Sequence, residues 1–471
     1  MTTKKLTKNL ASVQRSLSQM FDAVPLISAI VQQISNHAGR VLLVGGAVRD
    51  LLLGDSIKDL DFEVYHLSLD DLEKLLASFG PVSLVGKSFG VLRLHGLDAD
   101  WSVPRTDSAG RKPQVTINAN MSMHDAFSRR DLTMNAMGID LVTGELIDPF
   151  NGLHDLENGV LRAPSLELFG EDPLRFYRVM QFIGRFDAYP DDQLNALCKN
   201  MDVSQVSIER VDAEFEKLLL RSKRPSLGIR WLAQIGRITD ILPELAATIG
   251  VAQEPSWHPE GDVFEHSMQS LDAAAVLSYK DEQEKLIILY AALCHDLGKV
   301  TTSKIIDGKI HSYGHEIAGI EPTKRLLKRI TTKKIIIDTV PVLVRYHMQP
   351  FLFEKAGNAA YKRLALKLAP RANVQMLCQL ALADKRGRGL QHTPLQIDFP
   401  ALRDFLHKAE QLQILYKPEE PLLQGKDIID AVAPGPKMGV LLQEAYKIQI
   451  AENIRDKEQL KKRVLGHKKK G

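Results

Sequence analysis

Two aspartates, Asp59 and Asp61, stand two residues apart where charged and apolar side chains alternate. Alternation with a period of two is typical of a half-buried strand, and it directs both carboxylates to the same face. Such carboxylates repel each other unless a cation lies near both, and a pair of Mg²⁺ ions would neutralise them and promote phosphoryl transfer. Asp100, on a later expected strand, is the candidate third carboxylate, and Asp98 and Glu63 are alternatives.

A Gly-Gly turn lies upstream of these aspartates. Gly45 and Gly46 follow a short apolar run and precede an expected helix, and the backbone N–H groups of such a turn can approach a phosphate closely. Arg49, one turn into that helix, is a candidate donor to phosphate oxygens. A Gly-Gly turn or an Asp-x-Asp pair alone is common in ordinary proteins, but the two together favour a nucleotide site.

A second group of chemically capable side chains occurs later, on or beside helical patterns. Imidazoles and carboxylates on converging helices are typical ligands of transition metals, often two ions with a bridging aspartate. Any one of these histidines is more simply a core or surface residue, but six candidates exceed the needs of one four-coordinate ion. We therefore predict a metal site with ligands enough for two ions, formed by His266, His295, Asp296, His315, His347 and Asp384.

Hydrophobic periodicity indicates the elements that position both groups. The first 150 residues mix short strand patterns with helical ones and predict an α+β domain with a mixed sheet. From about residue 152 strand patterns disappear, and amphipathic helical stretches follow almost to the end. Pro, Gly and polar residues mark candidate boundaries at 149–152, 253–261 and 417–421.

The composition sets broad limits. The chain of 471 residues has 61 basic and 58 acidic side chains and a net charge of +3, so an RNA partner would need locally concentrated charge. Basic runs at 324–334 and 461–470 are candidates, although each alone is more simply a solvated helix face or terminus. Three scattered cysteines fit a reducing cytoplasm, and neither a secretory signal nor a membrane-spanning apolar run is expected.

The first group of motifs resembles a known family. LVGGAVRD at 43–50 followed by KDLD at 58–61 resembles the head of bacterial tRNA nucleotidyltransferases and poly(A) polymerases, in the polymerase-β-like superfamily. Four further blocks follow in the family's order: RRDLTMNA at 129–136, DPFNGLHDL at 148–156, EDPLRFYR at 171–178, and IERVDAE at 208–214. Five ordered blocks make chance agreement improbable.

The resemblance implies roles for individual residues. Arg130 and Asp131 would contact the ribose and triphosphate, and Arg178 would assist at the triphosphate or base. Asp172 and Arg175, three apart, would share a helix face. Their carboxylate and guanidinium match the amino donor and ring acceptor of cytosine or adenine and would refuse guanine and uracil.

The implied reaction is attack of a tRNA 3′-hydroxyl on the α-phosphate of CTP or ATP, which builds the CCA end. Mg²⁺ ions bound by Asp59 and Asp61 would provide the electrostatic stabilisation for this reaction. The loop at 107–113 resembles one that helps such enzymes change from C to A.

The histidines resemble a second family. The order H…HD…H…H…D, with HDLGK at 295–299, resembles the HD superfamily of metal-dependent phosphohydrolases. The resemblance implies that the adjacent His-Asp pair and the outlying residues bind a transition metal (Ni, Mn, Fe or Co). It also implies phosphatase or 2′,3′-cyclic phosphodiesterase activity. His258 is an additional neighbour without an assigned place.

Together these inferences predict an α+β head followed by helical domains. The expected domains are an N-terminal helical extension (1–38), the nucleotidyltransferase head (39–150), a helical neck for nucleobase and RNA binding (151–250), the HD domain (251–416) and a helical tail (417–471).

Three alternatives remain open. One is a poly(A) polymerase, against which the VGKSFG block at 85–90 and the HD domain argue. The second is an enzyme that adds only CC or only A. The third is an RNA-binding protein with a dead site, against which the intact acidic and basic residues argue. The sequence does not reveal the oligomeric state.

Overall fold

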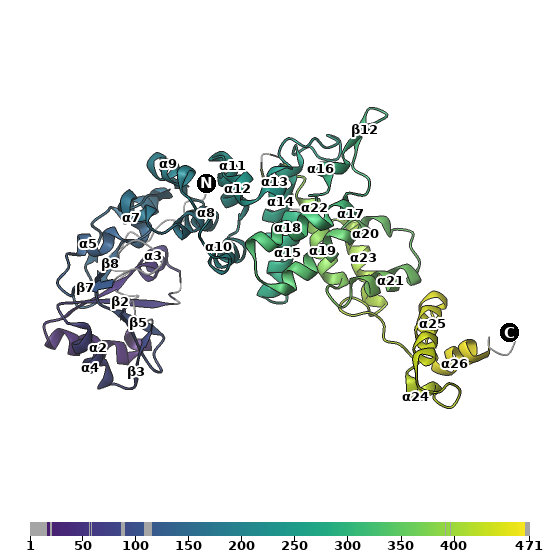
Figure 1. The fold of residues 1–471 in the computed structure, drawn as a ribbon, viewed down its shortest axis with the longest axis horizontal. Helices are drawn as coiled ribbons and strands as arrows, with labels where there is room; N and C mark the ends of the chain where they lie inside the picture. Colours follow the sequence, from purple (N-terminus) through teal and green to yellow (C-terminus); the bar gives the residue numbers. More distant parts are fainter. Residues whose placement is uncertain are drawn as a thin grey trace. The chain divides into compact units, whose positions relative to one another are not determined.

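The chain forms two compact units, residues 1–206 and 207–471 (Figure 1). The computed structural model describes residues 17–18, 21–55, 57, 59–85, 90–107, 115–390, 392–395 and 397–466. Several sequence predictions lie outside the described residues: residues 1–16, 19 and 20 of the N-terminal extension, Lys58, the block at 86–89, the loop at 108–113 and the basic tail at 468–470.

A seven-stranded sheet organises the first unit. Its strand order is β3-β4-β5-β2-β1-β8-β9, with β2 and β5 parallel and the other neighbours antiparallel. A separate hairpin joins β6 (Arg105–Asp107) to β7 (Val115–Ile117). The sheet strands are β1 (Arg40–Val44), β2 (Leu60–Tyr65), β3 (Val82–Val85), β4 (Val91–Leu94), β5 (Ala99–Ser102), β8 (Gly138–Asp140) and β9 (Leu146–Ile147).

The helices of the first unit are mostly short. The expected helices near 47–53 and 69–79 are present as α3 and α4. They belong to a set comprising α2 (Pro25–Asn36), α3 (Gly46–Leu53), α4 (Leu69–Ala77), α5 (Met123–Ser128), the 3₁₀ helix η1 (Thr133–Asn135), α6 (Gly152–Asn158), α7 (Leu166–Gly170), α8 (Leu174–Phe186) and α9 (Asp192–Asn200), with a short pair of strands, β10 (Val160–Leu161) and β11 (Tyr189–Pro190).

The two faces of the sheet have different surroundings. Phe62 and Val64 of β2 are fully buried in a large apolar core, where the Phe62 and Trp101 rings lie 4.5 Å apart. Asp61 and Glu63 alternate with them and therefore lie on the other face. A smaller apolar cluster, including Tyr65 and Phe127, covers only part of that second face. The predicted half-buried strand is confirmed, and it starts at Leu60, one residue after Asp59.

The second unit is almost entirely helical. Its central helices α14, α15, α19 and α22 pack on one another, and every residue of α14 is buried. Side-chain caps start several of them: Asp262 accepts the Glu265 N–H at 2.8 Å at the start of α14, and Asp281 accepts that of Glu284 at 2.8 Å at the start of α15. The predicted α+β head followed by helical domains is confirmed.

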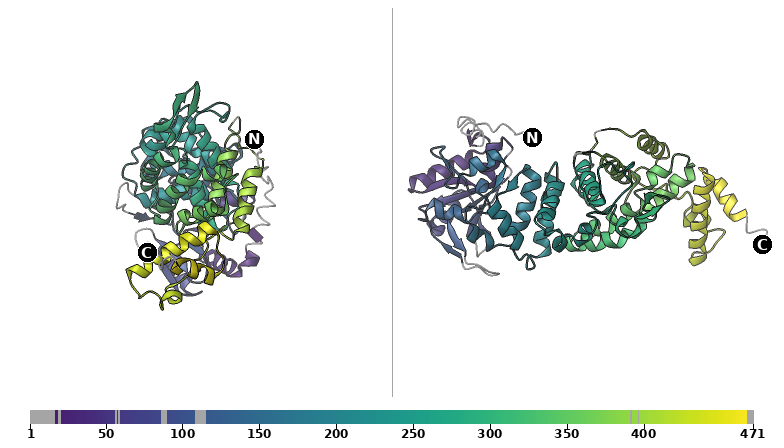
Figure 2. Two further views of the ribbon diagram at one scale, coloured as in Figure 1. Left: turned by 90° about the vertical axis from the view of Figure 1, so that its right-hand side faces the viewer. Right: turned by 90° about the horizontal axis from the view of Figure 1, so that it is seen from above.

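The elements of the second unit follow in chain order. One hairpin, β12 (Lys304–Ile306) with β13 (Lys309–His311), interrupts the helices and projects from them (Figures 1 and 2). The helices are α10 (Ile208–Arg221), α11 (Ser226–Gln234), α12 (Ile238–Ile241), α13 (Pro243–Ala246), α14 (Val263–Ala275), α15 (Glu282–Cys294), α16 (Lys299–Thr302), α17 (His315–Ala318), α18 (Ile320–Ile330), α19 (Lys334–Tyr346), α20 (Gln349–Leu352), α21 (Asn358–Leu368), α22 (Val374–Arg386), α23 (Pro400–Gln411), α24 (Gly425–Ile428), α25 (Pro436–Glu452) and α26 (Lys457–Gly466).

The last three helices share a small apolar core of their own, with Leu441 and Leu460 among its buried members. No helix within the described part of the chain is long and apolar enough to cross a membrane.

Candidate active sites

The parallel pairing of β2 and β5 brings two predicted carboxylates together in the first unit. Asp61 and Asp100 are register partners on these strands, and both line a cavity of about 300 Å³. Glu63 and Arg130 line the same cavity. Asp59 lies at the bend before β2 and is exposed, and neither it nor the alternative Asp98 is among the lining residues.

The charges around Asp61 suit a divalent cation. The enclosed surroundings of its carboxyl raise the pKa of Asp61, and the nearby Asp100 and Asp59 raise it further, although Arg130 opposes them. Asp100 is held by Arg93 of β4, with nitrogen–oxygen distances of 2.7 and 2.6 Å. Crowded carboxylates on a partly enclosed sheet face are the donors that Mg²⁺ prefers. The residues present therefore fit the divalent metal that this kind of head implies.

The Gly-Gly turn lies beside the same carboxylate. Gly45 has a φ of +73°, and a Cβ atom there would lie 2.9 Å from Nη1 of Arg130 and 3.9 Å from Oδ2 of Asp61. A side chain at this position would therefore collide with the arginine. Gly46 begins α3. The fold thus brings together the turn, the arginine and the aspartate that the sequence singled out separately.

Arg49, the expected phosphate ligand, is bonded to side chains within the protein. Its guanidinium is buried, with Nη1 2.5 Å from Oδ1 of Asn135 and with Nε and Nη2 2.9 and 2.7 Å from Oδ1 of Asp50. The rings of Phe182 and Phe186 lie 5.6 and 4.9 Å from it. These hydrogen bonds use three of the five N–H donors of the guanidinium and hold it in place, and a contact with phosphate stays a prediction.

Asp131 and Arg178 form an internal pair. Asp131 is buried, accepts a hydrogen bond from Nε of Arg178 at 2.6 Å, and makes a second close contact with the same guanidinium. It also accepts one from Nδ2 of Asn135 at 2.9 Å. Burial alone would raise the pKa of Asp131, but Arg178 and these hydrogen bonds lower it. Asn135 therefore joins Arg49 to Asp131. Sequence reasoning did not single it out, although it lies within the RRDLTMNA block.

The expected shared helix face of Asp172 and Arg175 is wrong. Helix α8 begins at Leu174, so Asp172 precedes it, and the Asp172 carboxylate accepts the Leu174 N–H at 3.1 Å. The guanidinium of Arg175 donates to the backbone carbonyls of Leu168 at 2.7 Å and Arg129 at 2.5 Å. Burial lowers the pKa of Arg175. These bonds fix the arginine at the start of α8.

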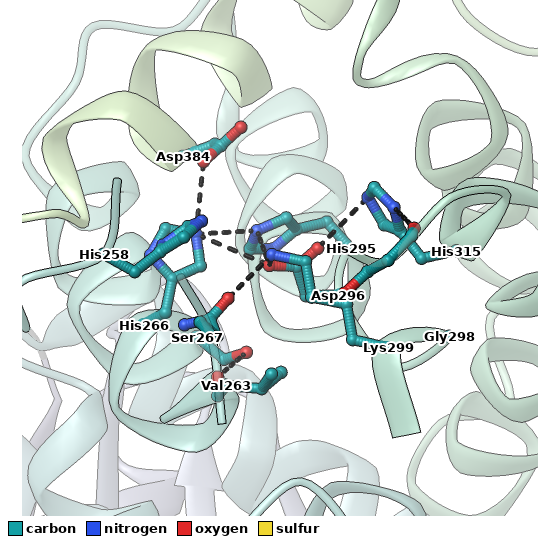
Figure 3. A network of polar contacts seen from close by, with 12 residues as sticks. His258, Val263, His266, Ser267, His295, Asp296, Gly298, Lys299, His315 and Asp384 are labelled. Carbon is teal, nitrogen blue, oxygen red and sulfur yellow. Dashed lines mark hydrogen bonds and ion pairs between the residues drawn. The ribbon is translucent and has the colours of Figure 1, made fainter. Parts of the chain in front are cut away.

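The six histidines and aspartates predicted to bind metal converge in the second unit, and Figure 3 labels all of them except His347. All six are buried. They come from separate elements: His266 from α14, His295 and Asp296 from the end of α15, His315 from α17, His347 from the end of α19, and Asp384 from α22.

Two groups of ligands share the Asp296 carboxylate. Around Oδ2, the Nε2 atoms of His295 and His266 lie at 3.3 and 3.6 Å. His266 Nε2 is also 3.1 Å from Oδ1 of Asp384.

Around Oδ1 of Asp296, the Nε2 atoms of His315 and His347 lie at 3.4 and 4.0 Å. These two groups could each hold a metal ion, with Asp296 common to both.

The imidazoles face one another as metal ligands do. The Nε2 atoms of His266 and His295 are 3.2 Å apart, as are those of His315 and His347. Two nitrogens bonded to one tetrahedral ion at about 2.1 Å lie about 3.4 Å apart. Burial, with the charges of His315 and His295, lowers the pKa of His347 to about 3, which leaves it neutral and able to ligate.

The bridging carboxylate has unused bonding capacity. Both oxygens of Asp296 are buried without a hydrogen bond of acceptable geometry, although Nζ of Lys299 lies 2.7 Å from Oδ2. Lys299 offsets part of the cost of burying this carboxylate, and a metal ion would use the bonding capacity that its oxygens keep. The donor set and the orphaned oxygens fit the divalent metals that an HD domain implies.

The hydrogen bonds behind the ligands fix their orientation. The Nδ1 atoms of His295, His315 and His347 are 2.7 to 2.8 Å from backbone carbonyls, which directs their Nε2 atoms to the centre. For His266 the partner is a carboxylate, Oε1 of Glu260, at 2.7 Å. The same Glu260 oxygen is 2.8 Å from Nδ1 of His258, which gives that histidine a place at the edge of the centre. Sequence reasoning missed Glu260, which lies outside the family motif.

Comparisons with known families identify the domains that contain the two sites. Residues 41–162 match the Poly A polymerase head domain, and residues 263–386 match the HD domain. Fold and sites therefore define a protein that joins a nucleotidyltransferase head to an HD domain.

Relatives identify the family. The Multifunctional CCA protein of Pasteurella multocida is 34% identical over 82% of this chain and 92% of its own length. That of Neisseria meningitidis serogroup A is 33% identical over 75% of this chain and 84% of its own length. The chain belongs to the multifunctional CCA protein family, and the resemblance of the sequence motifs is confirmed.

Solved structures share the fold. The Bacillus stearothermophilus CCA-adding enzyme in complex with CTP has a TM-score of 0.64 and 21% identity, over 94% of this chain and 98% of that one. The Thermotoga maritima CCA-adding enzyme complexed with tRNA has a TM-score of 0.58 and 20% identity, over 95% of each chain.

Replacing Asp61 tests the carboxylate site. Asp61→Ala should lower the rate of nucleotide addition by roughly 10²-fold or more, because it removes a preorganised charge at the reacting phosphate. RNA is held mainly through its phosphates by basic residues, so the affinity for tRNA should change by less than about twofold. Single-turnover addition and filter binding measure the two effects. Asp98→Ala removes an exposed aspartate outside the cavity and should act as wild type; near-normal turnover in Asp61→Ala would refute the assignment.

Replacing Asp296 tests the metal centre. Asp296→Ala should lose bound transition metal, because both groups of ligands use this carboxylate. Elemental analysis of the purified protein measures the loss, and nucleotide addition should persist because the head has its own carboxylates. Asp404→Ala, an exposed aspartate of the same unit, is the control and should keep its metal. Full metal content in Asp296→Ala would contradict the two-ion arrangement.

Proposed function

We propose that this protein adds CCA to the 3′ end of tRNA from CTP and ATP, without a nucleic-acid template. The observation that carries the proposal is the pairing of Asp61 with Asp100 beside Arg130 in one cavity, in a chain of the multifunctional CCA protein family. The named complexes of structural relatives with CTP, ATP and tRNA support these partners.

The reaction joins a tRNA 3′-hydroxyl to the α-phosphate of the incoming nucleotide, and pyrophosphate leaves. Asp61 and Asp59 would hold Mg²⁺, which supplies charge neutralisation and activation of the hydroxyl. Arg130, beside the Gly45 turn, would bind the triphosphate oxygens. Asp100 is held by Arg93, so its part is to set the negative potential at the site as a third carboxylate.

Asp172 and Arg175 would select the base. Arg175 already uses two donors on backbone carbonyls, so its orientation is fixed before a nucleotide arrives. A preorganised guanidinium and a nearby carboxylate at the start of α8 can read the amino and ring-nitrogen edge that cytosine and adenine share. Arg178 would act through Asp131 at the triphosphate or base, and Arg49 through Asn135.

The second unit would act as a phosphohydrolase, a phosphatase or a 2′,3′-cyclic phosphodiesterase. The Asp296 carboxylate between two groups of histidines carries this part of the proposal. Its metal would be Ni, Mn, Fe or Co, because imidazole-rich sites favour such ions.

The proposal also includes the domains of the chain and its cellular compartment. The neck at 151–250 would bind the nucleobase and RNA, and the tail at 417–471 would follow the HD domain. Three free, buried cysteines suit the cytoplasm.

Incubation of the purified protein with tRNA lacking CCA and each labelled nucleotide tests the main activity. CTP alone should give two added residues, and ATP should be added only after them. Addition of only C or only A would reassign the protein to a partial activity. A long run of A would indicate a poly(A) polymerase, and no addition would indicate a dead nucleotidyl site.

Base selection has its own test. Asp172→Ala should raise incorporation of UMP and GMP relative to CMP by roughly 5- to 150-fold, since a lost base-reading pair removes about 1–3 kcal/mol of discrimination. Competition between labelled nucleotides measures the ratio. Glu167→Ala, an acidic residue in the neighbouring helix α7, provides the control. Wild-type discrimination in Asp172→Ala would exclude selection by this side chain.

A further inference from the structure

One arginine beside the HD centre has hydrogen-bond donors that its surroundings do not fully use. Arg388 lies just after α22, four residues beyond the ligand Asp384, and its side chain is 17% exposed. Its Nη2 is 3.6 Å from Oδ1 of Asp384, beyond hydrogen-bonding distance, and its Nε is buried without a hydrogen-bond partner. An arginine whose role was to pair with Asp384 would make short, parallel bonds to that carboxylate.

The backbone on either side of Arg388 is held tightly. A Cβ atom on Gly387 would lie 2.1 Å from Oγ of Ser270 in α14, and one on Gly389 would lie 1.7 Å from the carbonyl oxygen of Thr393. The carbonyl of Gly389 also accepts a hydrogen bond from Nε2 of Gln269 at 2.9 Å. The guanidinium is therefore presented from a fixed backbone packed on α14, the helix that carries His266.

Lys299, another cation at the centre, lies at the bridging position and contacts two partners inside the protein. Nζ of Lys299 is 2.7 Å from Oδ2 of Asp296 and 2.7 Å from Oε1 of Gln253. Arg388 lies on the other side of the centre, at Asp384, and its guanidinium has donors available there for an added anion. Its nearest acid, Asp384, is a predicted metal ligand and would give its charge to the metal.

We propose that Arg388 binds the non-bridging phosphoryl oxygens of the substrate at the HD centre and of the phosphate product. The inference rests on the proposed phosphohydrolase function and names its anion-binding residue. The planar guanidinium fits two phosphoryl oxygens at once, which an ammonium group does not do. Arg388 keeps its protons throughout and acts by holding the phosphoryl group in place and stabilising its charge.

The test uses the full chain as purified, with its metal content measured. Inorganic phosphate is titrated calorimetrically into wild type, Arg388→Lys and Arg388→Gln, and Asp296→Ala reports any phosphate bound outside the HD centre. Arg388→Gln should weaken phosphate binding by roughly 10- to 100-fold, since charge-assisted hydrogen bonds are lost, and Arg388→Lys should recover part of it. KM for a phosphate monoester such as p-nitrophenyl phosphate should rise in parallel.

A neighbouring arginine gives a matched control. Arg386→Gln removes the same charge two residues away, from a side chain that donates to the carbonyl of Ile397 at 3.3 Å, and should leave phosphate affinity unchanged. Unchanged phosphate affinity in Arg388→Gln would overturn the inference. So would loss of metal from that variant, which would make Arg388 a support of the ligands, or failure of wild type to bind phosphate. If wild type binds phosphate through Arg388 yet hydrolyses no ester, the proposed phosphohydrolase fails while the anion site stands.

Discussion

Both sites depend on the electrostatic cost of holding carboxylates in place. In one site two carboxylates lie close together, and in the other a carboxylate is buried away from water. On the sheet, the parallel register of β2 and β5 sets Asp61 opposite Asp100. In the helical unit, Asp296 is buried with both oxygens short of hydrogen bonds. Like charges repel and buried charges lose hydration, and the chain offsets part of this cost itself, with Arg93 at Asp100 and Lys299 at Asp296. A bound divalent cation would offset more of it, so the surrounding elements must be rigid enough to keep the acids in place until it binds.

That rigidity has a different source in each unit. Behind the head site, Asn135 accepts from Arg49 and donates to Asp131, which in turn holds Arg178 of α8. Two arginines that motif reasoning assigned to the nucleotide thus connect α3, η1 and α8. In the HD centre the histidines are oriented one by one, through backbone carbonyls or Glu260. A network fixes the first site, and independent single bonds fix the second.

The sequence predicted what depends on local periodicity and on ligand count. The alternation around Asp61 placed it on an open strand face, and six imidazoles and carboxylates implied a site for two metals. The sequence did not predict features that depend on contacts between distant parts of the chain. Arg49 is buried because Phe182 and Phe186 of α8 approach it, which no spacing near residue 49 reveals. The position of Asp172 outside α8 does have a signal in the sequence. Asp172 precedes Pro173, and a residue before proline is biased away from helical conformation.

The spread of the HD ligands along the chain has a thermodynamic consequence. His266 and Asp384, whose side chains lie 3.1 Å apart, are 118 positions apart in sequence, and the other ligands lie between them on further elements. Such a site exists only when these elements are assembled, so the free energy of ion binding adds to the free energy of folding. The three cysteines are all free, so no disulfide helps to hold these elements together. A bound ion would therefore hold these elements together reversibly. The free energy of unfolding of the helical unit should rise with the concentration of available metal.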